Sequence, residues 1–177
     1  MIDLHTHTTA SDGTYTPEDL VALAHELGIS HLAITDHDSV QAIAPAREAC
    51  KKLGITLIPA IELSVRYRDR PMDILGYGIQ PDHPRLTEAL ATQIERRNRR
   101  IPLMLKRLEE RGLNLTEADV REAAQGQVIG RPHIARALVD KGVVDSIAEA
   151  FEKYLGRGRS GYVPKEVLAP IDAIQLI

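Results

Sequence analysis

The sequence predicts an α/β fold, because residues 1–80 alternate short apolar runs with helical stretches. Three apolar runs read as strands: "MIDLH", "HLAIT" and "ITLIPAIEL". Each run is separated from the next by a stretch long enough for one helix. Strands and helices that alternate at this spacing are typical of parallel βαβ units, in either an open sheet or a barrel.

The first expected helix has clear signals at both ends. Thr16 supplies a capping hydroxyl, Pro17 suits the first helical position, and Asp19 adds an acid to the first turn. Gly28 follows "LVALAHEL" and marks the end of this helix. The segment "TPEDLVALAHEL" is therefore expected to connect the first two strands.

The second expected helix starts at Asp38 or Ser39, either of which can cap it, and runs to Gly54. After the third strand, "VRYRDRPMDILGYGI" predicts two extended segments joined by a turn near Asp69. Together these elements form the expected region 1–84.

From residue 85 to residue 161 the pattern becomes helical throughout. A basic helix is interrupted or kinked at Pro102, and "RPHIARALVDKG" forms another helix with Pro132 in its first turn. Ser146 and Glu149 have the spacing of a capping box for "IAEAFEKYLG". We therefore expect an all-helical insertion at 85–161 and a return to the α/β region at 162–177.

The composition excludes several classes of protein. The 177 residues carry a net charge of −3, with 44% hydrophobic and 27% charged residues, which predicts a globular core. Aromatic residues make up only 3%, so neither a base-stacking surface nor stable duplex nucleic-acid binding is expected. Cys50 is the only cysteine, and no apolar run approaches the ~20 residues of a membrane span. These observations predict a cytoplasmic protein.

A His-x-His pair near the amino terminus is the first candidate for chemistry. His5 and His7 stand at positions i and i+2 of a strand, so both side chains are expected on one face, with Ile2 and Leu4 on the other. Two imidazoles on one face can bind one cation, and Asp12 follows in the next loop. The alternative is a pair of exposed histidines without function.

Two further strands favour the metal-binding alternative. His37 follows the second strand in "AITDHDS", and Glu62 stands near the end of the third in "AIELS". The carboxyl ends of parallel strands meet at one rim, where active sites form. The sequence therefore predicts a shared metal site at that rim. Asp36, beside His37, either orients a ligand or makes an ordinary strand-end hydrogen bond.

The segments "DLHTHTTASDG", "ITDHDS", "PAIELS", "LGYGI" and "GRPHIARALV" resemble the PHP (polymerase and histidinol phosphatase) superfamily, in its branch of nucleoside-bisphosphate phosphatases and 5′–3′ exonucleases. The resemblance covers essentially the whole chain. It implies a distorted seven-stranded β/α barrel, a trinuclear metal centre and a helical insertion. The positions that match the family's metal-binding pattern are His5, His7, Asp12, His37 and Glu62.

The chain departs from the family pattern at two points. Asp73 in "RPMDILGYG" stands where this branch commonly has a histidine. An aspartate can bind a divalent cation through oxygen, so Asp73 is a sixth ligand candidate; the alternative is a polar strand-end residue. The family's remaining ligands lie in a carboxyl-terminal half that this chain lacks. Without 85–161, 100 residues are left, against ~200–250 for a closed barrel, so we expect a fragment with a partial barrel.

The candidate ligands are imidazoles and carboxylates, a set that suits Mn²⁺ best, with Fe²⁺ or Zn²⁺ as alternatives, and up to three ions in the full-length protein. The resemblance implies that Glu62 bridges the ions and that Asp12 and His37 belong to the catalytic set. Clustered cations activate water at neutral pH, so a metal-bound hydroxide would attack phosphorus without a side-chain nucleophile. Ser11 has no nucleophile motif around it.

The helical insertion predicts the substrate. Residues 93–111 carry seven Lys or Arg residues against three acids, which is either a solvated surface or a site for a polyanion. Arg131 and His133 lie at a helix start that can receive phosphate, and Arg159 lies in a glycine-rich loop. We expect hydrolysis of nucleoside 3′,5′-bisphosphates or of the ends of short RNA. The alternatives are a histidinol-phosphate phosphatase and an inert fragment that binds metal or nucleotide.

Overall fold

The computed structural model describes residues 1–68, 70–124 and 129–177. The chain forms two compact units. The sheet unit comprises Met1–Gln93 and Val167–Ile177, and the helical unit comprises Ile94–Glu166. The helical unit therefore starts nine residues later and ends five residues later than the expected insertion at 85–161.

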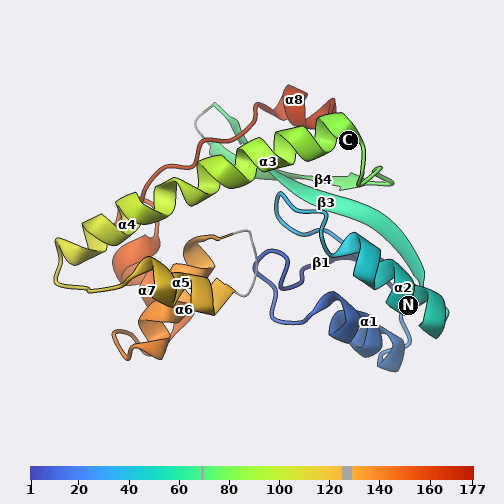
Figure 1. Cartoon of the computed structure of the whole chain (residues 1–177), viewed down its shortest axis with the longest axis horizontal. Helices are drawn as coiled ribbons and strands as arrows, with labels where there is room; N and C mark the ends of the chain where they lie inside the picture. Colours follow the sequence, from blue (N-terminus) through green and yellow to red (C-terminus); the bar gives the residue numbers. More distant parts are fainter. Residues whose placement is uncertain (69, 125–128) are drawn as a thin grey trace. The chain divides into compact units, whose positions relative to one another are not determined.

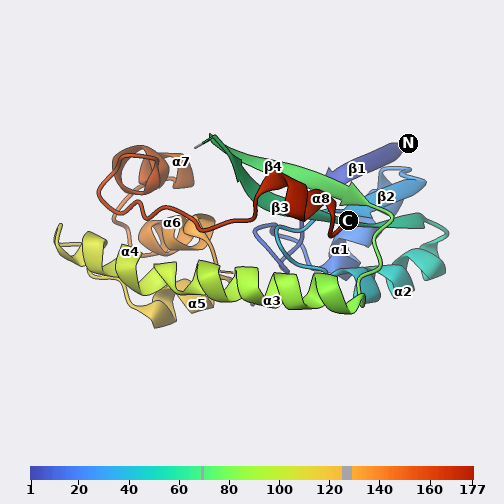
Figure 2. The same ribbon diagram turned by 90° about the horizontal axis from the view of Figure 1, so that it is seen from above.

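The sheet unit contains a curved four-stranded sheet in the order β1-β2-β3-β4 (Figures 1 and 2). β1, β2 and β3 are parallel, and β4 is antiparallel to β3. The α/β prediction is thus confirmed. The strands and helices of this unit are β1 (Ile2–Thr6), α1 (Pro17–Glu26), β2 (His31–Ile34), α2 (Ile43–Leu53), β3 (Thr56–Tyr67), β4 (Arg70–Tyr77), the first part of α3 (Pro84–Asn98) and α8 (Pro170–Ile174).

Helices cover one face of this sheet and form its two apolar clusters. Leu32 and Ile34 of β2 pack with residues of α1 and α2, whereas Ile61 and Leu63 of β3 pack with residues of α3 and α8. All four side chains are fully buried. Because side chains alternate along a strand, Glu62 lies on the face opposite Ile61 and Leu63.

Helix α1 begins as the sequence predicts, because the Thr16 hydroxyl accepts a hydrogen bond from the Asp19 amide at 3.1 Å. The prediction that Asp38 or Ser39 caps α2 is wrong. That helix follows Ala42 and has no side-chain cap. Asp38 instead adopts a left-handed φ of 51° and accepts a hydrogen bond from the Ser64 amide at 3.1 Å. The turn expected near Asp69 lies outside the described residues.

Strand β1 carries one extra residue relative to β2. Asp3 pairs with Leu32 and Thr6 pairs with Ile34, so three steps along β1 match two steps along β2. Such a bulge changes the direction of the side chains that follow it. Ile2 and Leu4, which were expected on the face opposite the histidines, are both exposed.

The helical unit has its own apolar core, to which α4, α5, α6 and the segment around Leu155 contribute. The interruption expected at Pro102 lies at Arg99, three residues earlier. Proline lacks the amide that would bond to the carbonyl four residues before it, so a helix breaks on the amino-terminal side. The elements are the end of α3, α4 (Arg100–Glu109), α5 (Glu117–Ala124), α6 (Arg131–Asp140), α7 (Ile147–Ala150) and a π-helix (Phe151–Leu155).

Several arginines of the basic segment have structural partners. Arg100 donates to the carbonyl of Val163 at 2.5 Å, and Arg107 donates to the carbonyl of Tyr162. Arg99 pairs with Glu95 one turn away on the helix. Part of the local positive charge therefore stabilises the helical unit itself. Among the described residues, no helix is both long enough and apolar enough to span a bilayer.

Candidate metal centre

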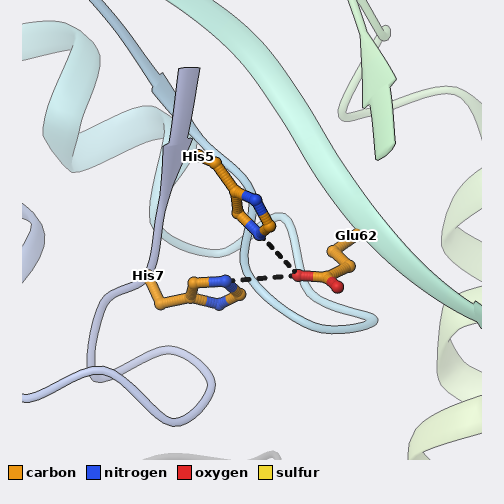
Figure 3. A group of neighbouring side chains, drawn as sticks. All are labelled: His5, His7 and Glu62. Atoms are coloured by element: carbon orange, nitrogen blue, oxygen red, sulfur yellow. Dashed lines mark hydrogen bonds and ion pairs between the residues drawn. The ribbon is translucent and has the colours of Figure 1, made fainter. Parts of the chain in front are cut away.

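The side chains of His5 in β1 and His7 directly after β1 meet at one carboxylate oxygen of Glu62 in β3 (Figure 3). Glu62 Oε2 lies 3.1 Å from His5 Nε2 and 3.2 Å from His7 Nε2. The Glu62 side chain is 9% exposed, whereas that of His5 is 52% exposed. The group therefore has a buried carboxylate and one side that is open to solvent.

His37 and Asp12 extend this group. His37 Nδ1 lies 3.8 Å from Glu62 Oε2, and His37 Nε2 lies 3.8 Å from Asp12 Oδ2. Asp12 Oδ1 lies 3.5 Å from His7 Nδ1. The rings of His7 and His37 are neighbours, with their centroids 4.9 Å apart. Each imidazole thus lies close to a carboxylate.

The backbone explains why His37 and Glu62 lie side by side. His37 and Glu62 form an isolated parallel bridge beyond the end of β2. The Glu62 amide donates to the Asp36 carbonyl at 3.3 Å, and the Asp38 amide donates to the Glu62 carbonyl at 2.9 Å. The loop after β2 therefore pairs with β3 at the level of the candidate ligands.

Asp73 of β4 belongs to a third group of close ligand atoms, with His37 and Glu62. It pairs with Ser64 across the β3–β4 ladder, on the same face as Glu62, and it is exposed. The structure thus brings all six ligand candidates to one region of the sheet unit. Whether each one binds metal stays a prediction.

The charges of these groups are strongly coupled. Burial tends to raise the pKa of Glu62, but hydrogen bonds from His7 and His5 and the charge of His37 outweigh burial and lower this pKa to about 2. The hydrogen bond to Glu62 raises the pKa of His7 above its usual 6.5, against the opposing effect of burial. Glu62 is therefore ionised at neutral pH, and its charge holds the proton of the His7 imidazole to a higher pH than usual.

The donor set and its spacing fit divalent cations. Two ligand atoms about 2.1 Å from one ion lie about 3.0–3.4 Å apart at the angles of ordinary coordination geometries. The His5–Glu62 and His7–Glu62 distances of 3.1 and 3.2 Å lie in this range. His37 Nδ1 is buried and has no hydrogen-bond partner among the described residues, as expected for an atom that binds an ion. The ligand atoms of three groups lie within 4.8 Å of one another: His5, His7 and Glu62; His7, Asp12 and His37; His37, Glu62 and Asp73.

Asp36 lies beneath this site and is only 1% exposed. Its Oδ1 accepts hydrogen bonds from the Thr8 amide at 2.7 Å and the Ser11 hydroxyl at 2.6 Å, and its Oδ2 accepts one from the Thr8 hydroxyl at 2.7 Å. Burial raises the pKa of Asp36, and these hydrogen bonds oppose that effect. The sequence showed no sign of the hydrogen bond between Ser11 and Asp36, because no periodicity or motif marks a serine whose partner lies 25 residues later.

The loop that carries Asp12 depends on a close approach at Gly13. A Cβ atom on Gly13 would lie 2.4 Å from the carbonyl carbon and oxygen of His7. We expect Gly13→Ala to lower the free energy of unfolding by about 1–3 kcal/mol, the usual cost of overpacking. Chemical denaturation of the metal-free chain measures this loss.

Gly28→Ala is the matched control, because a Cβ at Gly28 meets no atom within 4 Å although its φ is +71°. Only backbone strain applies there, so a loss of about 1 kcal/mol is expected. A loss at Gly13 no larger than the loss at Gly28 would contradict the close approach.

The three substrate candidates all belong to the helical unit. The Arg131 guanidinium lies 5.5 Å from the centroid of the Phe151 ring and 5.4 Å from that of Tyr162, and it donates to the Leu155 carbonyl at 3.2 Å. His133 is buried, and its Nδ1 accepts a hydrogen bond from the Gly130 amide. Arg159 is exposed. A role in phosphate binding stays a prediction for all three.

Curated relatives match almost the whole chain. A 5′–3′ exoribonuclease of Escherichia coli is 45% identical over 99% of this chain. A 3′,5′-nucleoside bisphosphate phosphatase of Chromobacterium violaceum is 35% identical over 98%. The chain spans 60% and 61% of the lengths of these two relatives.

Solved structures share the fold. A structure described as an amidohydrolase of Chromobacterium violaceum, with bound sulfate and no metal, matches 99% of this chain and 62% of its own at 34% identity, with a TM-score of 0.95. A protein of Bifidobacterium adolescentis described as a metal-dependent phosphoesterase matches 98% of this chain and 62% of its own at 31% identity, with a TM-score of 0.91. These matches confirm the expected PHP-type α/β fold. The PHP domain profile matches residues 3–158, and the chain belongs to the PHP domain family.

Proposed function

We propose that this chain carries the metal-binding part of a phosphoesterase that hydrolyses small nucleotides with two phosphates or the ends of short RNA. One observation carries the proposal: the imidazoles of His5, His7 and His37 surround a single buried oxygen of Glu62. A buried carboxylate at the centre of three imidazoles suits a catalytic divalent site. The names of the two curated relatives support the choice of substrate.

His5, His7, Asp12, His37, Glu62 and Asp73 would hold the cations, up to three in a protein of the relatives' length, with Mn²⁺ preferred over Fe²⁺ or Zn²⁺. When bound, the cations would activate water and neutralise the charge of the phosphate. Glu62 would contribute its carboxylate to more than one cation. Asp12 and His37 would fix the orientation of the reacting phosphate relative to Glu62.

Arg131, His133 and Arg159 are the proposed contacts for a second phosphate. Arg131 lies at the start of α6, where the helix dipole favours an anion, and its guanidinium lies beside two aromatic rings. A small phosphorylated nucleotide or a short oligoribonucleotide has the charge that such contacts favour. The proposed location is the cytoplasm, where such substrates occur.

Metal content and hydrolysis assays test this proposal. The chain is loaded with Mn²⁺, and turnover is measured with adenosine 3′,5′-bisphosphate, histidinol phosphate and 5′-phosphorylated short RNA. The Escherichia coli relative, assayed in parallel, is the positive control. Preferred hydrolysis of histidinol phosphate would overturn the substrate class, and metal binding without any turnover would favour an inert metal-binding chain.

Metal affinity should rise with pH. Because the pKa of His7 is raised above 6.5, this imidazole keeps its proton to a higher pH than an ordinary histidine, and a cation must displace that proton. We therefore expect Mn²⁺ affinity to increase as pH rises through the raised pKa of His7. Isothermal titration at several pH values measures the change. The control variant His25→Gln, at an exposed residue of α1, should show the same dependence of Mn²⁺ affinity on pH.

The metal-free chain should show the opposite trend. The charged His7–Glu62 pair contributes stability that is present below pH 6.5 and is lost as pH rises through the raised pKa of His7. On the acid side, the contribution of Glu62 is present above its usual pKa of 4.5 and is lost as pH falls toward 2. The free energy of unfolding, measured with a metal chelator present, should show the change in both pH ranges. A free energy of unfolding that rises from about pH 6 to about pH 8 would contradict a stabilising charged pair between His7 and Glu62.

A further inference from the structure

We propose that Asp36 and Ser11 are positioning residues that fix the tautomer of His7, so that His7 presents Nε2 to the cation. The inference rests on the proposed function, because it assumes that His7 is a metal ligand. Neither residue would touch the cation. Both would act through His7, whose ring lies between Ser11 on one side and Glu62 on the other.

The first step concerns the hydroxyl proton of Ser11. Its oxygen has a single proton and three polar neighbours: Asp36 Oδ1 at 2.6 Å, Asp12 Oδ1 at 3.4 Å and His7 Nδ1 at 3.5 Å. Asp36 is far closer than the other two, and a hydrogen bond between two oxygens weakens once their distance exceeds the usual range of about 2.5–3.0 Å. The proton therefore lies toward Asp36, and the Ser11 oxygen offers only lone pairs to its other neighbours.

The second step concerns the His7 ring. Its Nδ1 faces two acceptors, the Ser11 oxygen at 3.5 Å and Asp12 Oδ1 at 3.5 Å. A nitrogen between two acceptors is favoured in its N–H form. In the metal-free chain Nε2 donates to Glu62 Oε2 at 3.2 Å, and when a cation displaces that proton the one remaining N–H is on Nδ1 and the lone pair is on Nε2. A cation shared with Glu62 would meet this lone pair.

The third step concerns rigidity. Ser11 is 2% exposed and Thr8 is fully buried, and both bond to Asp36. The Ser11 and Gly13 amides also donate to the Thr8 carbonyl at 3.0 and 2.9 Å, which closes the loop on itself. Asp36 thus holds the Ser11 hydroxyl in place from below. Partners that fix the orientation and tautomer of a metal-bound histidine typically change metal affinity by about 10–100-fold.

The test compares Ser11→Ala, Asp36→Asn and the control Ser39→Ala with the unaltered chain. Ser39 is as buried as Ser11, and its hydroxyl accepts a hydrogen bond from the Gln41 amide. Zn²⁺ affinity is measured by competition with a chromophoric chelator. We expect Ser11→Ala and Asp36→Asn to bind Zn²⁺ about 10–100-fold more weakly. Ser39→Ala should stay within about twofold, since it leaves the contacts of His7 intact.

A spectroscopic readout separates positioning from a merely structural role. Long-range ¹H–¹⁵N spectra of the Zn²⁺-loaded chain should show a protonated Nδ1 and a metal-shifted Nε2 for His7, and this pattern should be lost in the two variants. Melting of the metal-free proteins shows whether each variant is folded. If Ser11→Ala fails to fold, the His7 spectrum of Asp36→Asn decides the question.

Two results would overturn the inference. One is equal Zn²⁺ affinity in the unaltered chain, Ser11→Ala and Asp36→Asn. The other is a metal-shifted Nδ1 of His7 in the unaltered chain. Absence of Zn²⁺ binding in the unaltered chain would overturn both the metal site and the inference, whereas Zn²⁺ binding without turnover would overturn only the proposed hydrolysis.

Discussion

Glu62→Gln is expected to weaken binding of Mn²⁺ or Zn²⁺ by about 100-fold or more, the scale of removing one partner from a desolvated charge pair. The glutamine keeps the size of the side chain but removes the charge that three imidazoles share. It also removes the largest cause of the raised pKa of His7, which should fall toward 6.5. Calorimetry measures the affinity, and NMR titration of His7 measures the pKa.

The matched control for Glu62→Gln is Glu48→Gln, which makes the same chemical change on the exposed surface of α2. It should change metal affinity by less than about twofold, because exposed charges interact weakly with a site through solvent. If both variants bound metal equally well, Glu62 would not be a ligand. Loss of hydrolysis with unchanged affinity would instead give Glu62 a role after metal binding.

Leu138→Ala is expected to lower the free energy of unfolding of the helical unit by about 2–5 kcal/mol, the usual cost of a large-to-small change in a core. Leu138 is fully buried in the apolar cluster of that unit, among residues of α4, α5 and α6. Denaturant unfolding monitored by circular dichroism measures the loss. Metal affinity should stay within about twofold, because all six candidate ligands belong to the sheet unit.

Leu103→Ala provides the comparison for this variant. Leu103 lies on α4 in the same unit but is 55% exposed, so its truncation should cost no more than about 0.5 kcal/mol. A similar loss for both leucines would contradict the described core. A large loss of metal affinity in Leu138→Ala would show that the metal site depends on the helical unit.

The sequence predicted the α/β class and the convergence of candidate ligands for a simple physical reason. β2 and β3 are parallel neighbours, so the loop after β2 runs beside β3 and brings His37 next to Glu62, although β3 continues beyond Glu62 to Tyr67. The start of α1 was equally predictable, because Thr16 and Asp19 interact within one turn. The strands and the start of α1 were predictable because periodicity and capping depend only on residues that are close in the sequence.

Features that depend on long-range contacts could not be predicted in this way. Asp38 has the sequence signature of a helix cap, yet its carboxylate bonds to Ser64, which lies 26 residues later. Asp36 likewise finds Thr8 and Ser11 more than 24 residues earlier in the chain. Single-sequence rules favour local partners, and tertiary contacts overrode them at these two positions. The bulge in β1 was missed because it exists only relative to β2.

This extra residue in β1 limits how the gene can change in length. Removing Thr6 would restore an uninterrupted ladder with β2, but it would also place His5 opposite Ile34, on the face of the sheet that points away from Glu62. Deletion of the Thr6 codon should therefore be eliminated by selection even where it leaves the chain well folded. Alignments of distant homologues should show a strictly constant spacing from His5 to His7.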